Sequence, residues 1–239
     1  LLCGEAGTGA GFAARCLAAD YLYPNGGPHA EAVLRGQDTE SIVVRGEGAS
    51  GQIKVEAIRD ARQNIQKSAL SSDAEGRVLL IYGAQNLNGA SANAMLKIME
   101  EPPEGVMFLL TASSAAAVLP TIRSRCVSFA VAPVSPEQCA RYCAAQGVDK
   151  KTAALYSELF DGHIGTVLAA AQDEARTAQV EKALQLAKAA ADRDSYAAAC
   201  LLAAYEKDKA GAAALLTDFR AVAAAGLRQS PHAPVQGIA

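Results

Sequence analysis

A glycine-rich stretch near the start of the chain has the spacing of a phosphate-binding loop but lacks the side chains that make such a loop work. Gly4 and Gly9 stand where the pattern G-x-x-x-x-G-K-[ST] requires glycine. The lysine position holds Ala10, and the serine or threonine position holds Gly11. Without the lysine no positive charge reaches the β- and γ-phosphates, and without the hydroxyl this loop cannot ligate Mg²⁺. A plain strand-to-helix turn is the alternative interpretation.

The apolar strand that follows also lacks the acidic residue of a nucleotide site. Residues 78–81 form a continuous run of Val, Leu, Leu and Ile, which is typical of a strand covered on both faces in a parallel sheet. In an active P-loop ATPase an aspartate on such a strand helps to hold Mg²⁺. Here the run is followed by Tyr82 and Gly83. We therefore predict a nucleotide-binding fold that hydrolyses no nucleotide, and we expect no cofactor and no metal site.

Two closely spaced arginines are the next candidates for chemistry. Residues 123–126 (Arg-Ser-Arg-Cys) lie between a predicted turn at residues 119–121 and a short predicted strand at residues 127–130. In an extended chain Arg123 and Arg125 would share a face, whereas in a tight turn one of them would project outward. Composition alone favours the simpler interpretation, a pair of surface arginines.

A pair of adjacent carboxylates, Glu100 and Glu101, ends a predicted helix just before Pro102. Adjacent residues on a helix point about 100° apart, so the two side chains are poorly placed to act together as an acid and a base. A solvated helix end is the preferred interpretation.

The cysteines show no pattern of metal binding. There is no C-x-x-C pair, and the three histidines are scattered. Because structural zinc needs about four converging ligands, small buried thiols in a reduced cytoplasm are the preferred interpretation of all six. They are Cys3, Cys16, Cys126, Cys139, Cys143 and Cys200.

Composition excludes several classes of protein. The 239 residues carry a net charge of −3, which argues against a protein that coats nucleic acid, and 51% of them are hydrophobic, which argues against global disorder. No apolar run reaches the roughly 18–20 residues that cross a bilayer, so we expect no membrane association. The first residues, Leu1 to Cys3, read as the end of a strand, so we expect the first domain to be incomplete at its N-terminus.

The pattern of predicted elements changes near residue 133. Before it, strands alternate with helices, which favours a parallel α/β sheet, and residues 23–35, rich in Pro, Gly and Asn, are predicted to be a loop. After it, every segment reads as helical. We place the boundaries so that the chain has three parts, namely residues 1–132, 133–173 and 174–239.

Two motifs carry a family resemblance. Residues 93–103 (NAMLKIMEEPP) and 119–126 (LPTIRSRC) closely resemble bacterial clamp-loader subunits of DNA polymerase III, which are AAA+ proteins with a P-loop NTPase-like fold. The likeness is strongest over residues 52–130. It implies an AAA+ α/β domain, a small helical lid domain and a C-terminal helical collar or oligomerisation domain for the three parts defined above.

Within this family the chain is most similar to the delta prime members, because the gamma and tau subunits keep both the loop lysine and the acidic strand end. The resemblance implies that Arg125 is an arginine finger, supplied in trans to the γ-phosphate held by a neighbouring subunit. Ser124 and Cys126 would shape the turn that aims it. The chain would be no enzyme by itself, but a cytoplasmic subunit that helps to load the sliding clamp.

The resemblance also implies partners: gamma/tau-type ATPase subunits and a delta-type subunit directly, with the sliding clamp and primed DNA reached through the complex. For direct contact with DNA the sequence leaves two interpretations open, a solvated helix face and a face that follows phosphates. The residues concerned are Lys54, Arg59, Arg62 and Lys67, set against Glu56 and Asp60. Two rival functions also stay open, a divergent subunit that does bind and hydrolyse ATP, and a scaffold with no part in ATP turnover.

Overall fold

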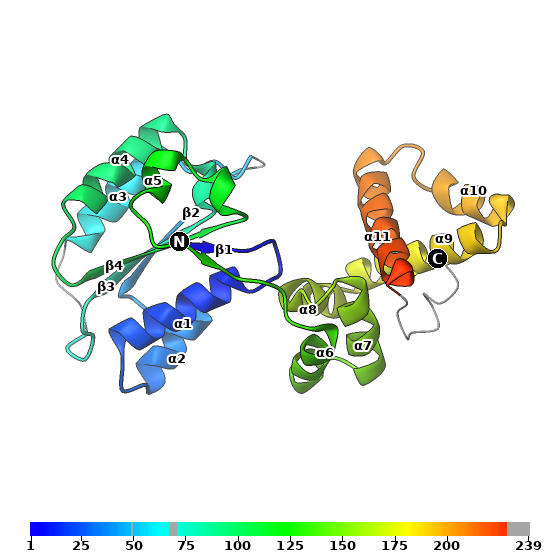
Figure 1. Ribbon diagram of the computed structural model, residues 1–239, viewed down its shortest axis with the longest axis horizontal. Coiled ribbons are helices and arrows are strands. Elements are labelled where there is room, and N and C mark those ends of the chain that lie inside the picture. Colours follow the sequence, from blue (N-terminus) through cyan, green and yellow to red (C-terminus); the bar gives the residue numbers. More distant parts are fainter. Residues whose placement is uncertain (49, 67–70, 229–239) are drawn as a thin grey trace. The chain divides into compact units, whose positions relative to one another are not determined.

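The structure is a computed structural model that describes residues 1–48, 50–66 and 71–228. The chain forms two compact units, Leu1–Ala132 and Pro133–Ala239. The first unit contains the sheet and the second is helical (Figure 1). Each unit is described by itself below.

The first unit is built on one parallel sheet of five strands, in the order β2-β3-β4-β1-β5. The predicted fold class, a parallel α/β sheet followed by helices, is confirmed. The strands are β1 (Leu2–Cys3), β2 (Ser41–Arg45), β3 (Arg77–Tyr82), β4 (Val106–Ala112) and β5 (Phe129–Ala130).

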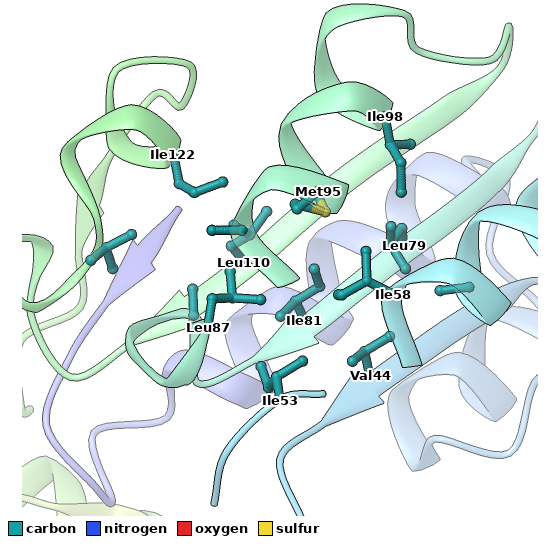
Figure 2. Packing of buried hydrophobic residues seen from close by; sticks show 14 of the residues in the cluster. Val44, Ile53, Ile58, Leu79, Ile81, Leu87, Met95, Ile98, Leu110 and Ile122 are labelled. Atoms are coloured by element: carbon teal, nitrogen blue, oxygen red, sulfur yellow. The ribbon is translucent and has the colours of Figure 1, made fainter. Parts of the chain in front are cut away.

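Helices cover both faces of this sheet, as the buried run in β3 predicts (Figure 1). Val78 and Leu80 pack with the first two helices, whereas Leu79 and Ile81 point to the other face and pack with the next helices. Figure 2 shows this second cluster, in which Ile81 lies between the sheet and the helices above it. The helices are α1 (Ala10–Leu22) and α2 (Pro28–Arg35) on the first face, and α3 (Val55–Ile65), α4 (Gly89–Glu100) and α5 (Pro120–Arg123) on the second, with short 3₁₀ turns at η1 (Ala84–Asn86) and η2 (Ala115–Ala117).

The prediction of a loop over residues 23–35 is wrong for its second half, which forms α2. Pro28 occupies the first turn, where its missing N–H costs nothing, and Gly36 ends the helix in the left-handed conformation. Val33 is buried, and Arg35 pairs with Glu31 one turn earlier. Pro28, one of the residues that suggested a loop, is thus the start signal of a short helix, and Gly36, just after the predicted loop, is its stop signal.

The strand predicted at residues 127–130 is confirmed only for its last two residues, which form β5. Val127 and Phe129 are largely exposed.

The helical unit comprises α6 (Pro136–Ala145), α7 (Lys150–Leu159), α8 (Ile164–Gln172), α9 (Glu174–Ala191), α10 (Ser195–Ala203) and α11 (Lys209–Leu227). Ser135 and Gln138 form a reciprocal capping box at the start of α6, and Asp149 caps α7. A single hydrophobic cluster runs from Cys139 to Ala225 and draws on both sides of residue 173. The division of this unit into a lid and a collar domain stays a prediction.

Helix α11 is long and apolar enough, by length and composition alone, to cross a membrane. Within the helical unit, however, its Leu215 and Val222 are buried in the shared core. Asp218, on the same helix, is almost fully buried and forms a two-pronged ion pair with Arg176 of α9. One face of α11 thus packs into the helical unit, whereas Leu216 on the same helix is exposed. The prediction that no stretch has the length and composition to cross a bilayer is wrong for this helix.

The buried-thiol interpretation holds for Cys139 and Cys143, which lie one turn apart in α6 without any exposed surface. It is wrong for Cys200, which is exposed on α10. Helix α10 has no fully buried residue among its nine, and Cys200 lies on its exposed side, whereas Ala198 and Leu201 pack partly against the core.

We expect the exposed thiol of Cys200 to react before the buried thiol of Cys143. Burial, reinforced by the neighbouring Cys139, raises the pKa of Cys143 to about 12, and only the thiolate reacts with maleimides or disulfide reagents. At pH 8 a maleimide should therefore label Cys200 rapidly and Cys143 only after unfolding in urea, as measured by peptide mass spectrometry. Labelling of Cys143 at the rate of Cys200 in the native protein would contradict the packing of α6.

Candidate functional site

The glycine-rich loop joins β1 to α1 and has the backbone geometry of a strand-loop-helix turn. Gly9 caps α1 in a left-handed conformation, with φ of 94°, which an L side chain rarely adopts. A Cβ on Gly4 would lie 2.6 Å from the carbonyl oxygen of Val131, so this position also requires glycine. No side chain caps the start of α1. The loop thus leaves backbone N–H groups at the N-terminus of a helix, the arrangement that attracts anions.

Tyr82, at the carboxyl end of β3, packs beside the end of this loop. A Cβ on Gly11 would lie 3.0 Å from Cε1 of the tyrosine, so the ring packs directly against the first turn of α1. Nη1 of Arg15 donates a hydrogen bond to the Tyr82 hydroxyl at 3.2 Å, and the guanidinium carbon of Arg45 lies 4.0 Å from the centre of the ring. Stacking and hydrogen bonding therefore hold the ring in place.

Sequence reasoning identified Tyr82 and Gly83 only as missing charges, and it missed Arg15 and Arg45 altogether. At the end of β3 the structure has a packed group of one aromatic ring and two guanidinium groups. Arg45 lies beside Tyr82 because the two residues are partners in the parallel register of β2 and β3. No spacing in the sequence gives that register.

The second candidate site lies after α5, in the turn that leads to β5. The N–H groups of Ser124, Arg125 and Cys126 donate to carbonyl oxygens of α5, so the turn continues the helix for three residues. The hydroxyl of Ser124 donates to the carbonyl oxygen of Thr121 at 3.1 Å. Cys126 is half-buried, and burial raises the pKa of its thiol, so this group packs rather than acts as a nucleophile.

The side chains of the two arginines diverge. Arg123 turns back to the carbonyl oxygen of Ala115, with a distance of 3.2 Å from its Nη1 atom. Arg125 donates from Nη1 to the carbonyl oxygen of Thr121 at 3.2 Å and from Nη2 to Oε1 of Glu100 at 2.7 Å. The Arg125 side chain remains 40% exposed. Its guanidinium group is therefore held at the surface and is not packed inside the fold.

The two adjacent carboxylates, Glu100 and Glu101, differ in their contacts. A solvated helix end is the right description of Glu101, which is exposed and forms no ion pair with any residue that the structure describes. Glu100, however, binds Arg125, which is 25 positions away in sequence. The contact forms because α4 and α5 pack against each other on the same face of the sheet (Figure 1).

The two candidate sites lie at opposite edges of the sheet. The glycine loop follows β1 and Tyr82 ends β3, so both are at the carboxyl edge of the parallel strands. Arg125 precedes β5, and it lines an apolar groove of about 640 Å³ together with Val106, the first residue of β4. This is the amino edge. The structure therefore does not bring Arg125 together with the chain's own glycine loop.

A third feature is a basic groove of about 340 Å³ between α3 and α4. It is lined by Arg59 and Arg62 of α3 and by Asn93 and Lys97 of α4. Of the other basic residues singled out from the sequence, Lys54 pairs with Glu47 at 2.8 Å, and Lys67 lies outside the described residues. The sequence identified the α3 arginines, but it did not show that Lys97 lies across from them.

Comparison with known proteins adds to this geometry. The model of the family described as "DNA polymerase III, delta subunit" matches residues 1–135. DNA polymerase III subunit delta' of Escherichia coli strain K12 is 32% identical over 168 residues, which are 70% of this chain and 48% of that protein. The tau subunit of the same organism is 40% identical over 92 residues, which are 38% of this chain and 14% of that protein.

Among solved structures, a DNA polymerase III gamma subunit-related protein of Thermotoga maritima aligns with 95% of this chain and 76% of its own, at 18% identity and a TM-score of 0.44. The chain spans less than half the length of the curated relatives that it matches. The family match covers more than half of the chain, from the glycine loop through the arginine turn. The chain therefore belongs to the DNA polymerase III delta subunit family.

Proposed function

We propose that this chain is a delta prime-type subunit of the clamp loader, which hydrolyses no ATP itself and supplies Arg125 to the nucleotide site of a neighbouring subunit. The observation that carries the proposal is the separation of the two sites. The chain's own loop lacks the lysine and the hydroxyl and has Tyr82 packed beside Gly11, whereas Arg125 is exposed at the opposite edge of the sheet. An arginine so placed can serve only a nucleotide bound by another chain.

The partners follow from this role. A gamma- or tau-type subunit would hold the ATP that Arg125 reaches, a delta-type subunit would complete the assembly, and the clamp and primed DNA would be engaged by the complex. The basic groove between α3 and α4 is the surface of this chain best suited to phosphate groups, because Arg59, Arg62 and Lys97 converge there. We place this work in the cytoplasm.

A divergent ATPase is the second candidate, since tau subunits are among the relatives. It requires the loop of this chain to hold MgATP. The Tyr82 ring packs against Gly11, which stands where the loop pattern has its Mg²⁺-binding hydroxyl. Two arginines contact that ring, and their positive charge disfavours a second cation such as Mg²⁺ beside it.

Nucleotide binding separates the two candidates. We expect no saturable binding of a fluorescent ATP analogue to the isolated chain at micromolar concentration, with or without Mg²⁺, because the lysine, the hydroxyl and the acidic residue are all absent. A gamma-type subunit measured in parallel by fluorescence anisotropy is the positive control. Tight, Mg²⁺-dependent binding to this chain would refute the non-hydrolysing assignment.

The role in the complex is tested by reconstitution. The chain is combined with gamma-type and delta-type partners, and loading of the sliding clamp onto primed DNA is measured with and without it. We expect loading to require this chain. Equal loading in the absence of this chain would refute the proposed clamp-loader function, whatever the result for nucleotide binding.

A further inference from the structure

The contact between Glu100 and Arg125 fixes the direction of the arginine side chain. Nη2 binds the Glu100 carboxylate at 2.7 Å, and Nη1 binds the Thr121 carbonyl oxygen at 3.2 Å. A guanidinium group is planar and carries five N–H bonds. Two tethers of this kind define its plane and leave three N–H bonds, on Nε and on both Nη atoms, for another ligand.

Both tethers are attached to rigid parts of the fold. Glu100 is the last residue of α4, whose Met95 and Ile98 are buried in the core, and Figure 2 shows both side chains packed toward the sheet. Thr121 precedes Ile122, which is also fully buried. The start of α4 is fixed by a reciprocal capping box between Asn88 and Ser91, the third residue of the helix. The carbonyl oxygen of Thr121 and the backbone of Glu100, which carries the carboxylate, are therefore held in place relative to the sheet.

The ion pair is too exposed to matter much for stability. Arg125 and Glu100 are 40% and 51% exposed, and exposed ion pairs contribute little to the free energy of folding. What such a pair does is restrict a long side chain that would otherwise sample many rotamers in water. A finger that must meet a phosphate on another chain benefits from that restriction, because a group already in place needs no further ordering in the transition state.

We propose that Glu100 is a positioning residue for Arg125, holding the guanidinium group in the direction from which it reaches the neighbouring subunit's nucleotide. This inference rests on the proposed function of Arg125 as an arginine finger. In this role Glu100 contacts neither the nucleotide nor the water molecule that attacks it. It acts through the arginine alone.

The chain supplies its own control, since Glu101 has the same charge and is exposed without an ion pair in the described part of the chain. Four variants are compared: Glu100→Gln, Glu101→Gln, Arg125→Ala and the double variant Glu100→Gln/Arg125→Ala. The first measurement is the rate at which phenylglyoxal modifies Arg125 in the full chain, followed by mass spectrometry. We expect this rate to rise about two- to fivefold in Glu100→Gln and to stay unchanged in Glu101→Gln.

The second measurement is ATP turnover by the complex reconstituted with gamma-type and delta-type subunits. Glu100→Gln should lower turnover at the adjacent site about two- to fivefold, and Glu101→Gln should not change it. In the Arg125→Ala background, Glu100→Gln should have no further effect. Raising the salt concentration should shrink the difference between wild type and Glu100→Gln, because exposed charges are screened.

Several outcomes would overturn the inference. They are equal phenylglyoxal rates in the two glutamine variants, equal turnover in both, increased turnover in Glu100→Gln, or an equal loss from Glu100→Gln with and without Arg125. If Arg125→Ala leaves turnover unchanged, the proposed function fails and the positioning role fails with it. If Arg125→Ala lowers turnover but Glu100→Gln does not, the proposed function stands and only the role of Glu100 is lost.

Discussion

Replacing Arg125 by alanine should slow ATP turnover at the neighbouring subunit's site by about 10³-fold or more, the range found for arginine fingers. The transferring phosphoryl group gathers negative charge in the transition state, and a guanidinium group neutralises it where water is excluded. No other group of this turn can replace it, because the side chain of Arg123 is directed to the carbonyl oxygen of Ala115. Single-turnover ATP hydrolysis by the reconstituted complex measures the loss of hydrolysis rate at this one site, even where other sites of the complex remain active.

The variant should remain folded, which makes the result interpretable. Arg125 is 40% exposed, and its substitution removes one surface ion pair and one hydrogen bond to a carbonyl oxygen. Substitutions of this kind change the free energy of unfolding by about 1 kcal/mol or less. Arg123→Ala is the matched control, since it removes an arginine two residues away and should leave turnover close to wild type.

Arg125→Lys adds a second test of the mechanism. The lysine keeps the charge but loses the planar fork that can hold Glu100, Thr121 and a phosphate at once. We expect most of the activity to be lost in this variant as well. If turnover were unchanged in both Arg125 variants, the chain would be a scaffold with no part in hydrolysis.

The sequence contained the information for most of the first unit because its elements are locally specified. The run at residues 78–81 is apolar at every position since both of its faces are covered, and this pattern predicted β3 as an inner strand of a parallel sheet. Helix α2 was missed because Gly26, Gly27 and Pro28, just before or at its start, are also typical loop residues.

The parts of the site that depend on distant contacts were not predictable in this way. Tyr82 was recognised as a lost carboxylate, but its contact with Arg15 joins residues 67 positions apart. The pair of Glu100 and Arg125 likewise depends on how α4 and α5 pack, which no periodicity encodes. A single sequence shows which charged residues a motif lacks. It does not show which side chains from distant parts of the chain pack at that position.

The largest effect on stability is expected in the helical unit, at the ion pair between Arg176 of α9 and Asp218 of α11. Both Nη atoms of the arginine bind the carboxylate, and Nε2 of Gln179 adds a hydrogen bond at 3.0 Å. Asp218 is only 3% exposed, and the hydrogen bond to it raises the pKa of Arg176 above its usual value. The two partners differ in one respect that matters: 28% of the arginine side chain is exposed, whereas the carboxylate is almost fully enclosed.

Arg176→Ala should therefore lower the free energy of unfolding of the helical unit by about 3–5 kcal/mol, because it leaves a buried carboxylate with only Gln179 as a partner. Asp218→Ala should cost less, since the freed guanidinium group can turn into water. The double variant Arg176→Met/Asp218→Leu should recover most of the loss, because paired apolar residues of similar volume often replace a buried ion pair without penalty. Urea unfolding followed by circular dichroism, with hydrogen exchange of α9 and α11 to localise the change, measures all three. Equal losses in the two alanine variants would mean that the cost comes from the lost attraction between the partners rather than from the stranded carboxylate.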